Sequence, residues 1–310
     1  MSIWIYTHSA CLQHDTGPGH PESAERLQAL LTRLREPDFS EVTWQEAPAA
    51  SKDQLARVHE SAYVDAMLAR IPKEGLASID GDTVISSASG EAALRSAGAA
   101  VAAVDAVMSG QTQRAFCAIR PPGHHAEPAT AMGFCLFNNV AVAAAHARAE
   151  YHVDRVAIVD FDVHHGNGTQ AMFAGKRGYM YFSTHEHPLF PGTGHAPMPG
   201  VDNVVNVPLN RFTGSADFRD AFREFIIPQL EQFGPQLLLI SAGFDAHELD
   251  PLANLSLTTQ DYIWATEQLT YVANRFCNGA IVSLLEGGYD LQAVADAGAA
   301  HIRTLADNLA

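Results

Sequence analysis

The chain has 310 residues, of which 47% are hydrophobic, a length and composition ordinary for a globular protein with a sizeable core. It carries 19 basic and 35 acidic side chains, so its formal net charge is −16. This acidic balance argues against nucleic acid as a partner and favours cationic small molecules or basic peptides, although it also promotes solubility.

The four cysteines lie far apart and include no CxxC pair, which predicts neither a disulfide framework nor a thiolate zinc site. They are typical of reduced, cytosolic thiols. The N-terminal sequence MSIWIYTHSA has no basic region and no long apolar core, and no stretch approaches the length of a membrane span. We therefore expect a soluble, cytoplasmic protein with no membrane partner.

Apolar runs and helical periodicity alternate along the chain. The first half is expected to run as strand 3–6, loop 8–21, helix 22–35, helix 61–70, loop 75–89, helix 91–108, strand 115–119 and helix 138–150. The second half is expected to run as strand 156–159, strand 179–183, loop 185–195, strand 204–209, helix 217–233, strand 237–241, helix 259–276, strand 280–285 and a last helix to the C-terminus.

This alternation predicts parallel βαβ units in one α/β layered structure. Pro228 is expected to bend or interrupt the helix over 217–233, because proline lacks the N–H that a helix interior needs. No linker, repeat or low-complexity tract divides the sequence. We therefore expect one domain over residues 1–310.

Several of the predicted strands end in polar, glycine-rich sequence. These endings are RPPGHH at 120–125, DFDVHHGNGT at 160–169, AGFD at 242–245 and EGGYD at 286–290. Buried carboxylates and imidazoles are costly to desolvate unless something compensates their charge. Because the carboxyl ends of parallel strands meet at one edge of a sheet, where ligands bind, these four segments predict a single site.

A metal ion compensates carboxylates and imidazoles together. Alternate residues of an extended segment point the same way, so Asp162 and His164 can grip one ion, with Asp245 as a third ligand. Three nitrogen and oxygen ligands without a thiolate suit a catalytic Zn²⁺ that keeps a position open for water. Mn²⁺, Fe²⁺ or Co²⁺ also fits such a set.

The other polar residues at these strand ends suit amide hydrolysis. His124 and His125 are candidate bases, and Asp160 and Asn167 can hold their imidazoles by hydrogen bonds. Tyr289 can donate a hydrogen bond to an oxyanion. Each residue also has a plain structural alternative, such as a histidine in a surface turn or a tyrosine half-buried in the core. Together they favour a metal-assisted amide hydrolase.

Taken together, these residues and their flanking sequence resemble the histone deacetylase and acetylpolyamine amidohydrolase family of the arginase–deacetylase superfamily. The matching segments are GHPESAERL (19–27), LARVHESAYV (55–64), RPPGHHA (120–126), GFCLFNNVAVAA (133–144), VDFDVHHGNGT (159–169), FPGTG (190–194), SAGFDAHELDPL (241–252) and LEGGYD (285–290). The form HHGNGT, with Asn167, is similar to the class II branch and its bacterial histone deacetylase-like amidohydrolases. The resemblance implies three layers, with helices on both faces of a central, mostly parallel eight-stranded sheet.

The resemblance also implies catalytic roles. His125 matches the general base that activates water and then protonates the leaving amine. His124 matches its electrostatic partner, tied to Asp160, and Asn167 stands where the partner of His125 is expected. Tyr289 matches the tyrosine that polarises the acyl carbonyl, so we expect catalysis.

Three further sets of residues match the family's binding positions. The zinc ligands match Asp162, His164 and Asp245. The substrate tunnel and its rim match Phe134, Phe190, Gly133, Gly287, Leu252 and, in a variable loop, Asp82. The family's structural potassium sites match Asp160, Asp162, His164, Ser183 and Thr184, and a second group at Phe173, Lys176, Tyr179 and Asn203.

The resemblance predicts a zinc-dependent deacetylase of N-acetylated amines, with acetyl-lysine of proteins or peptides as first choice. An acetylpolyamine deacetylase is the direct alternative, and a tunnel-mouth carboxylate at Glu186, Glu248 or Asp250 would favour it. A non-catalytic acyl-lysine-binding module and an arginase-like binuclear manganese hydrolase are the remaining alternatives. The loops at 75–89 and 185–203 are expected to line the tunnel mouth or to contact a second subunit, which leaves the oligomeric state open.

Overall fold

The computed structural model describes residues 3–195 and 201–308. Eight strands form one sheet in the order β2-β1-β5-β10-β9-β6-β7-β8, and every adjacent pair is parallel. The strands are β1 (Trp4–Thr7), β2 (Thr43–Glu46), β5 (Arg114–Cys117), β6 (Val156–Asp160), β7 (Tyr179–Glu186), β8 (Val204–Leu209), β9 (Leu237–Ala242) and β10 (Ile281–Leu285). The predicted α/β fold around an eight-stranded sheet is confirmed.

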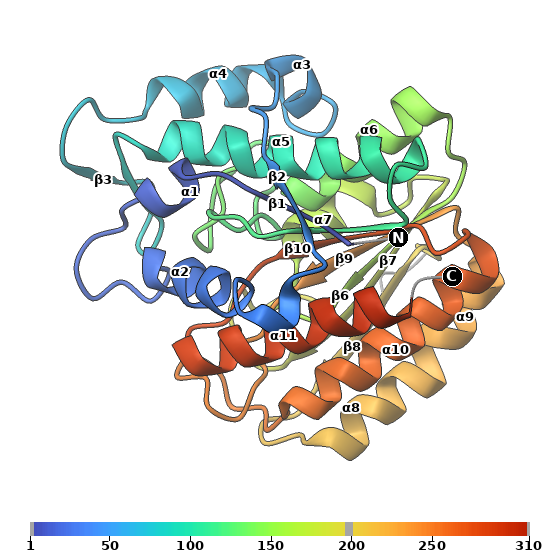
Figure 1. Ribbon diagram of the computed structural model, residues 1–310. Helices are drawn as coiled ribbons and strands as arrows, with labels where there is room; N and C mark the ends of the chain where they lie inside the picture. The colour runs from blue at the N-terminus through green and yellow to red at the C-terminus, as the bar shows by residue number, and fades with distance from the viewer. Residues whose placement is uncertain (1–2, 196–200, 309–310) are drawn as a thin grey trace.

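Helices cover both faces of this sheet (Figure 1). One face carries α5 (Ser89–Met108) and α6 (Asn139–Tyr151), and the other carries α2 (Ala24–Arg33), α10 (Thr259–Phe276) and α11 (Leu291–Asp307). The shorter elements are α1 (Ala10–Gln13), η1 (Pro37–Phe39), α3 (Lys52–Leu55), α4 (Ser61–Ala69), β3 (Leu76–Ser78), β4 (Val84–Ser86), α7 (Asn167–Phe173), α8 (Ser215–Ala221), η2 (Phe222–Ile226) and α9 (Ile227–Phe233).

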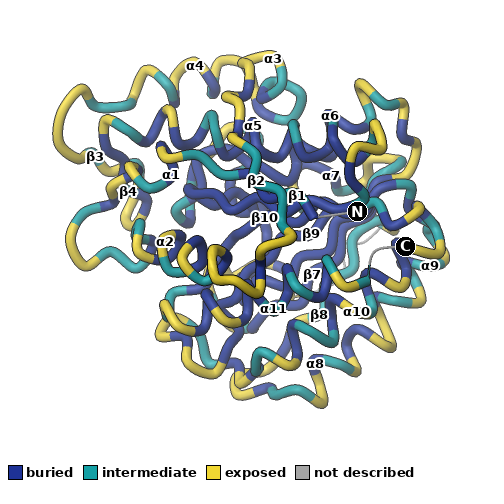
Figure 2. The backbone as a smooth tube through the Cα atoms, viewed as in Figure 1, coloured by how far each residue is buried: buried dark blue, intermediate teal, exposed yellow. Residues whose placement is uncertain are grey.

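Burial on both faces explains the continuous apolar sequence of the central strands. Every residue of β5, β6, β9 and β10 is buried, and Figure 2 shows the sheet as a buried layer between helices that are exposed on their outer sides. A strand covered on both faces has no solvent side, so it needs no alternating polar residues. In the part of the chain that the structure describes, no helix is long and apolar enough to cross a membrane.

Several elements differ from the sequence-based expectation. The edge strand β2 was not predicted, because its four residues are only partly buried and carry little pattern. The polar loop at 75–89 contains the hairpin β3–β4. The helix expected over 217–233 is broken by the π-helical turn η2, and Pro228 lies in the first turn of α9. A wider turn relieves the clash between a proline ring and the preceding carbonyl groups. The last helix ends at Asp307, and residues 309–310 lie outside the described residues.

A buried ion cluster joins α2 to the loop after β10. Glu22 accepts hydrogen bonds from Arg120 at 2.5 and 2.7 Å and from Arg26 at 2.8 Å. Arg26 also donates to the main-chain carbonyls of Glu286 and Gly288. Burial alone would raise the pKa of Glu22, but the arginine charges hold it well below its usual range. The cluster therefore holds a charged carboxylate behind the strand ends where the polar motifs lie.

Replacing Arg120 with methionine is expected to lower the free energy of unfolding by about 3–5 kcal/mol, because it leaves a buried carboxylate short of its main partner. Urea denaturation at pH 7 measures this loss. The matched control is Arg275→Met, whose exposed pair with Glu231 at 3.0 Å should contribute at most about 1 kcal/mol. Equal losses in the two variants would contradict the prediction.

His59 is buried and makes two directional hydrogen bonds. Its Nε2 accepts the main-chain N–H of Asn138 at 2.9 Å, so Nδ1 carries the proton donated to the carbonyl of Glu127 at 3.1 Å. Burial lowers the pKa of His59 to about 4. The folded chain therefore binds fewer protons than the unfolded chain between this pKa and the unperturbed value of about 6.5. Stability present above that window is lost as the pH falls through it.

The variant His59→Gln keeps a donor and an acceptor but does not titrate. It is expected to flatten the pH dependence of the unfolding free energy by about 1.4 kcal/mol per pH unit inside that window. Urea denaturation of both proteins from about pH 7 down to about pH 4.5 measures the two slopes. This range covers most of the window between the folded pKa of about 4 and the unperturbed pKa of about 6.5. An unchanged slope in the variant would show that His59 has the same pKa in the folded and the unfolded protein, which would contradict the prediction.

Candidate metal centre and catalytic site

Four neighbouring strands supply the polar loops that the sequence singled out. β5, β10, β9 and β6 are adjacent in the sheet and parallel, so their carboxyl ends share one edge. His124 and His125 follow β5, Asp162 follows β6, Asp245 follows β9 and Tyr289 follows β10. In sequence β6 is the next strand after β5, but in the sheet β10 and β9 lie between them. Segments distant in sequence therefore lie side by side.

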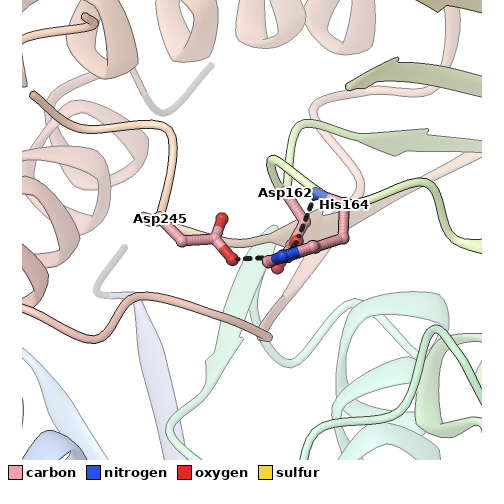
Figure 3. Close-up of side chains that lie close together, drawn as sticks. All are labelled: Asp162, His164 and Asp245. Atoms are coloured by element: carbon pink, nitrogen blue, oxygen red, sulfur yellow. Dashed lines mark hydrogen bonds and ion pairs between the residues drawn. The ribbon is translucent and has the colours of Figure 1, made fainter. Parts of the chain in front are cut away.

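The three predicted metal ligands lie together in this edge (Figure 3). Nδ1 of His164 is 3.2 Å from Oδ1 of Asp162 and 3.1 Å from Oδ2 of Asp245. One ligand atom from each residue falls within 4.8 Å of the others, and all three residues are buried. Within residues 3–195 and 201–308 this is the one group of three such side chains. An arginase-like binuclear site would need further ligands.

Main-chain N–H groups fix both carboxylates. Asp162 accepts from the N–H of Gly287 at 2.8 Å and of His164 at 2.9 Å, and Asp245 accepts from the N–H of Val163 at 2.8 Å. A Cβ at Gly287 would overlap the carboxylates of Asp245 and Asp162. This position therefore requires glycine, and the close approach holds the loop after β10 against the ligand set.

The electrostatics of the three side chains fit a divalent cation. Burial, and then the neighbouring Asp162 carboxylate, raise the pKa of Asp245. Burial opposes a charged His164, but its hydrogen bonds to both carboxylates raise its pKa to about 10. A cation binding the Nδ1 lone pair would neutralise both carboxylates and displace that proton. Two carboxylates and one imidazole suit Zn²⁺, and also Fe²⁺, Co²⁺ or Mn²⁺.

His124 sits between two buried carboxylates. Its Nδ1 is 3.0 Å from Oδ2 of Asp160, which also accepts from the hydroxyl of Tyr181 at 3.0 Å. Its Nε2 is 3.7 Å from Oδ1 of Asp162. Burial alone would lower the pKa of His124, but the charges of Asp162 and Asp160 raise it well above its usual value. The two carboxylates therefore favour the protonated form of His124.

The surroundings of His125 favour a neutral imidazole, unlike those of His124. Its Nδ1 is 2.9 Å from Oδ1 of Asn167, and the Nδ2 of that amide donates to Glu127 at 2.8 Å. Because this second bond fixes the amide, its oxygen faces His125, whose Nδ1 must carry the proton. Burial, and then the charges of His124 and His164, lower the pKa of His125 well below its usual value. The Nε2 lone pair of a neutral imidazole is therefore free to accept a proton.

Glu286 holds the backbone of the histidine pair by hydrogen bonds. Its Oε2 accepts the main-chain N–H groups of Gly123 at 2.7 Å and His124 at 3.2 Å, and its Oε1 accepts the hydroxyl of Ser241 at 3.0 Å. Sequence reasoning assigned this residue no role. The available signal was an acidic residue directly after the fully buried strand β10.

Tyr289 is held by its loop and by its ring. Its N–H donates to Asp250 at 2.7 Å, and its ring lies 4.7 Å from the guanidinium carbon of Arg26 and 6.0 Å from the ring of Phe134. Burial raises the pKa of Tyr289 well above its usual value. The hydroxyl therefore stays protonated and can donate a hydrogen bond. Neither Arg26 nor this use of Asp250 was predicted.

Two of the predicted tunnel residues, Phe190 and Gly133, lie against the histidines. Phe190 lies 5.1 Å from the ring of His125 and 6.2 Å from that of His164, measured between ring centroids. Gly133 has a φ of 55°, and a Cβ there would overlap the His125 ring. Phe190 and Leu252 are 39% and 37% exposed, so both present apolar surface to solvent.

Asp82 is exposed beside the same rim. Its side chain accepts from the hydroxyl of Thr83 at 3.2 Å, and that hydroxyl oxygen accepts the N–H of Phe134 at 3.1 Å. The ring of His20 also bridges the two segments, since it donates to the carbonyl of Asp82 at 2.9 Å and packs 4.9 Å from Phe134. The structure thus brings Asp82 next to the predicted tunnel wall.

Two of the three candidate tunnel-mouth carboxylates are already bonded within the protein. Glu186 is buried and accepts both the main-chain and side-chain N–H groups of Asn254, at 2.7 and 2.9 Å. Asp250 is buried and accepts two main-chain N–H groups at 2.7 and 2.9 Å. Glu248 is exposed. The buried pair therefore stabilises the loops whose N–H groups it accepts.

The first predicted potassium group is assembled around Asp160, which pairs with Ser183 in the ladder between β6 and β7. Ser183 shares a hydrogen bond of 2.9 Å with His185, and Oγ1 of Thr184 is buried without a hydrogen-bond partner. Asp162 and His164 follow on the adjacent loop. The second group, Phe173, Lys176, Tyr179 and Asn203, also lies together, but around the side-chain amide of Asn203.

Comparisons with known proteins agree with this geometry. The family model of the histone deacetylase domain matches residues 20–305. A histone deacetylase-like amidohydrolase of Pseudomonas aeruginosa is 38% identical over 95% of this chain and 83% of its own. The human polyamine deacetylase HDAC10 is 36% identical over 92% of this chain and 44% of its own. The crystal structure of the HDA15 HD domain superposes with a TM-score of 0.91 at 34% identity, covering 99% of this chain and 88% of that one.

The family match spans both halves of the chain and includes all four strand-end loops of the site. The solved structure has the same fold over nearly the full length. The predicted resemblance is therefore confirmed, and the chain belongs to the histone deacetylase family, whose members are deacetylases and related amidohydrolases.

Proposed function

We propose that the protein is a zinc-dependent deacetylase that hydrolyses the acetyl amide of N-ε-acetyl-lysine in proteins or peptides. The observation that carries this proposal is the buried Asp162–His164–Asp245 set next to two histidines with different partners, Asp160 for His124 and Asn167 for His125. When bound to these three side chains, a zinc ion would polarise the acetyl carbonyl and lower the pKa of a bound water.

The chain's own residues supply the rest of the reaction. Phe134, Phe190 and Gly133 enclose the aliphatic chain, and Tyr289 donates a hydrogen bond to the carbonyl oxygen as negative charge develops on it. Nε2 of His125 takes a proton from the attacking water, whose oxygen bonds to the carbonyl carbon.

The carbon–nitrogen bond then breaks, and His125 passes that proton to the leaving amine, which releases lysine and acetate. Asn167 keeps His125 in the required tautomer through the Nδ1 hydrogen bond. The cationic His124, held by Asp160, lies 4.0 Å from the His125 ring and stabilises negative charge in the transition state.

Two of the candidate tunnel-mouth carboxylates are bonded within the protein, which supports lysine over polyamine as the first choice. An acetylpolyamine carries further amine cations, which a carboxylate at the tunnel mouth would bind. Glu186 and Asp250 are committed to N–H donors, and Phe190 and Leu252 present apolar surface, whereas Glu248 and Asp82 are exposed carboxylates. The human polyamine deacetylase among the relatives keeps acetylpolyamine hydrolysis as the second candidate.

Turnover of an acetyl-lysine peptide and of N-acetylputrescine, each with zinc present and after chelation, tests the proposal. We expect kcat/KM to favour the peptide by at least about 10-fold, the factor that one lost ionic contact of roughly 1.4 kcal/mol produces. The matched variant Leu252→Glu should raise turnover of the polyamine and leave zinc binding unchanged. Faster hydrolysis of acetylputrescine by the unmodified protein would select the second candidate.

We also propose that residues 1–310 form one domain, because the central sheet takes β1, β2 and β5 from the first half and inserts β9 and β10 from the second. The oxygens of the first potassium group, with an uncommitted hydroxyl at Thr184, suit a structural monovalent cation. A cytoplasmic location stays a prediction from the sequence.

A further inference from the structure

Asn203, directly before β8, places its side-chain amide inside a ring of main-chain carbonyls. Nδ2 of Asn203 lies 2.9 Å from the carbonyl oxygen of Phe173, 3.1 Å from that of Lys176 and 3.0 Å from that of Tyr179. Phe173 is the last residue of α7, Lys176 lies in the turn that follows, and Tyr179 is the first residue of β7. Three carbonyl dipoles that converge on one point need a positively charged or N–H partner there.

The orientation of this amide is fixed from both ends. Oδ1 of Asn203 accepts the main-chain N–H of Gly175 at 2.8 Å, while Nδ2 faces the three carbonyls. Exchanging the oxygen and nitrogen would place an oxygen against three oxygens and would turn an N–H group toward another N–H group. The two amide hydrogens serve three acceptors, so one hydrogen is shared between two carbonyls.

The main-chain carbonyl of Asn203 is also engaged. It accepts the N–H of Tyr181 at 2.9 Å, as part of the pairing between β7 and the segment before β8. The resemblance to the histone deacetylase family implies that Phe173, Lys176, Tyr179 and Asn203 ligate a second potassium ion. In this chain these residues do not fit that ion as they stand. The side-chain amide nitrogen of Asn203 already lies at hydrogen-bonding distance from three of the four carbonyl oxygens, where the ion would have to bind.

We propose that the side-chain amide of Asn203 replaces the second structural potassium ion. The amide joins α7, the turn before β7 and the segment before β8 without a cation. Solvent access does not prevent an ion from entering, because a surface cavity of about 250 Å³ is lined by Lys176, Tyr179 and Asn203. What excludes potassium is the side chain of Asn203, whose amide nitrogen occupies the point where the three carbonyls converge.

Two measurements test this proposal without relying on activity. The first is anomalous diffraction from crystals of the unmodified protein grown with rubidium or thallium(I) in place of potassium. We expect no anomalous peak among the carbonyl oxygens of Phe173, Lys176 and Tyr179. A peak there, with the Asn203 side chain displaced, would overturn the proposal.

The second measurement is thermal unfolding of Asn203→Ala in potassium chloride and in tetramethylammonium chloride at equal ionic strength. Removing the amide opens the ring of carbonyls, so potassium should raise the Tm of the variant by about 2–4 °C more than it raises the Tm of the unmodified protein. The matched control is Asn206→Ala on β8, whose amide donates to Gln170 at 2.7 Å and touches none of these carbonyls.

Asn206→Ala should lose stability to the same extent in both salts. If potassium shifts the Tm of all three proteins equally, the carbonyl ring has no cation affinity and the proposal is wrong. If Asn203→Ala alone responds to potassium, and rubidium then appears among its carbonyls, the amide stands where a cation would bind.

Discussion

Replacing His125 with alanine is expected to lower kcat on an acetyl-lysine peptide by about 10²–10⁴-fold, the usual contribution of a general acid–base residue. His125 is the neutral imidazole of the pair, with Nδ1–H on Asn167 and Nε2 free. The neighbouring His124 is not expected to take over, because it is hydrogen-bonded to Asp160 and the carboxylates beside it raise its pKa. Steady-state kinetics together with a metal assay measures the effect.

The metal content of His125→Ala should equal that of the unmodified protein, since His125 is not one of the three ligands. His152→Asn is a suitable control, because this histidine is exposed at the end of α6 and has a φ of 53°, a conformation that asparagine accepts. Its activity should be unchanged. A His125→Ala protein that keeps a full metal complement and more than about a tenth of the activity would exclude His125 as the base, given the range for such residues.

Removing the hydroxyl of Tyr289 by substitution with phenylalanine is expected to lower kcat by about 10²–10³-fold, the effect of losing one donor to a developing oxyanion. KM should change little, because the ring keeps its contacts with Arg26 and Phe134. Zinc binding and the unfolding midpoint should also be retained. Steady-state kinetics over a range of acetyl-lysine peptide concentrations gives kcat and KM separately.

Tyr271→Phe provides the matched control. It makes the same chemical change, loss of a tyrosine hydroxyl, at a residue that is 58% exposed on α10. It should behave as the unmodified protein. If Tyr289→Phe instead raises KM and leaves kcat intact, the hydroxyl binds substrate in the ground state and does not act in the transition state.

The location of the site follows from the sequence because topology alone gathers it. Buried apolar runs separated by helices require parallel strands, and parallel strands carry their following loops to one edge. The loops after β6 and β9, with Asp162 and Asp245, are far apart in sequence but follow adjacent strands. The same reasoning missed β2 and the β3–β4 hairpin, whose short segments lack a clear pattern.

The supporting contacts could not be predicted, because they depend on packing between distant segments. Arg26 and Glu22 look like ordinary charged residues at the start of a helix, yet both are buried, and Arg26 reaches the loop after β10 while it pairs with Glu22. Glu286 and Asp250 act by accepting main-chain N–H groups, which no side-chain pattern reveals. For the same reason the sequence could not show that the side-chain amide of Asn203 binds three main-chain carbonyls.

Metal content measured alongside hydrolysis tests most directly whether Asp162, His164 and Asp245 hold the catalytic ion. We predict one divalent ion per chain, loss of acetyl-lysine hydrolysis after chelation, recovery on adding zinc, and loss of both ion and activity in Asp245→Asn. Full hydrolysis by the chelated protein, or an Asp245→Asn protein that keeps its ion and its activity, would contradict the assignment.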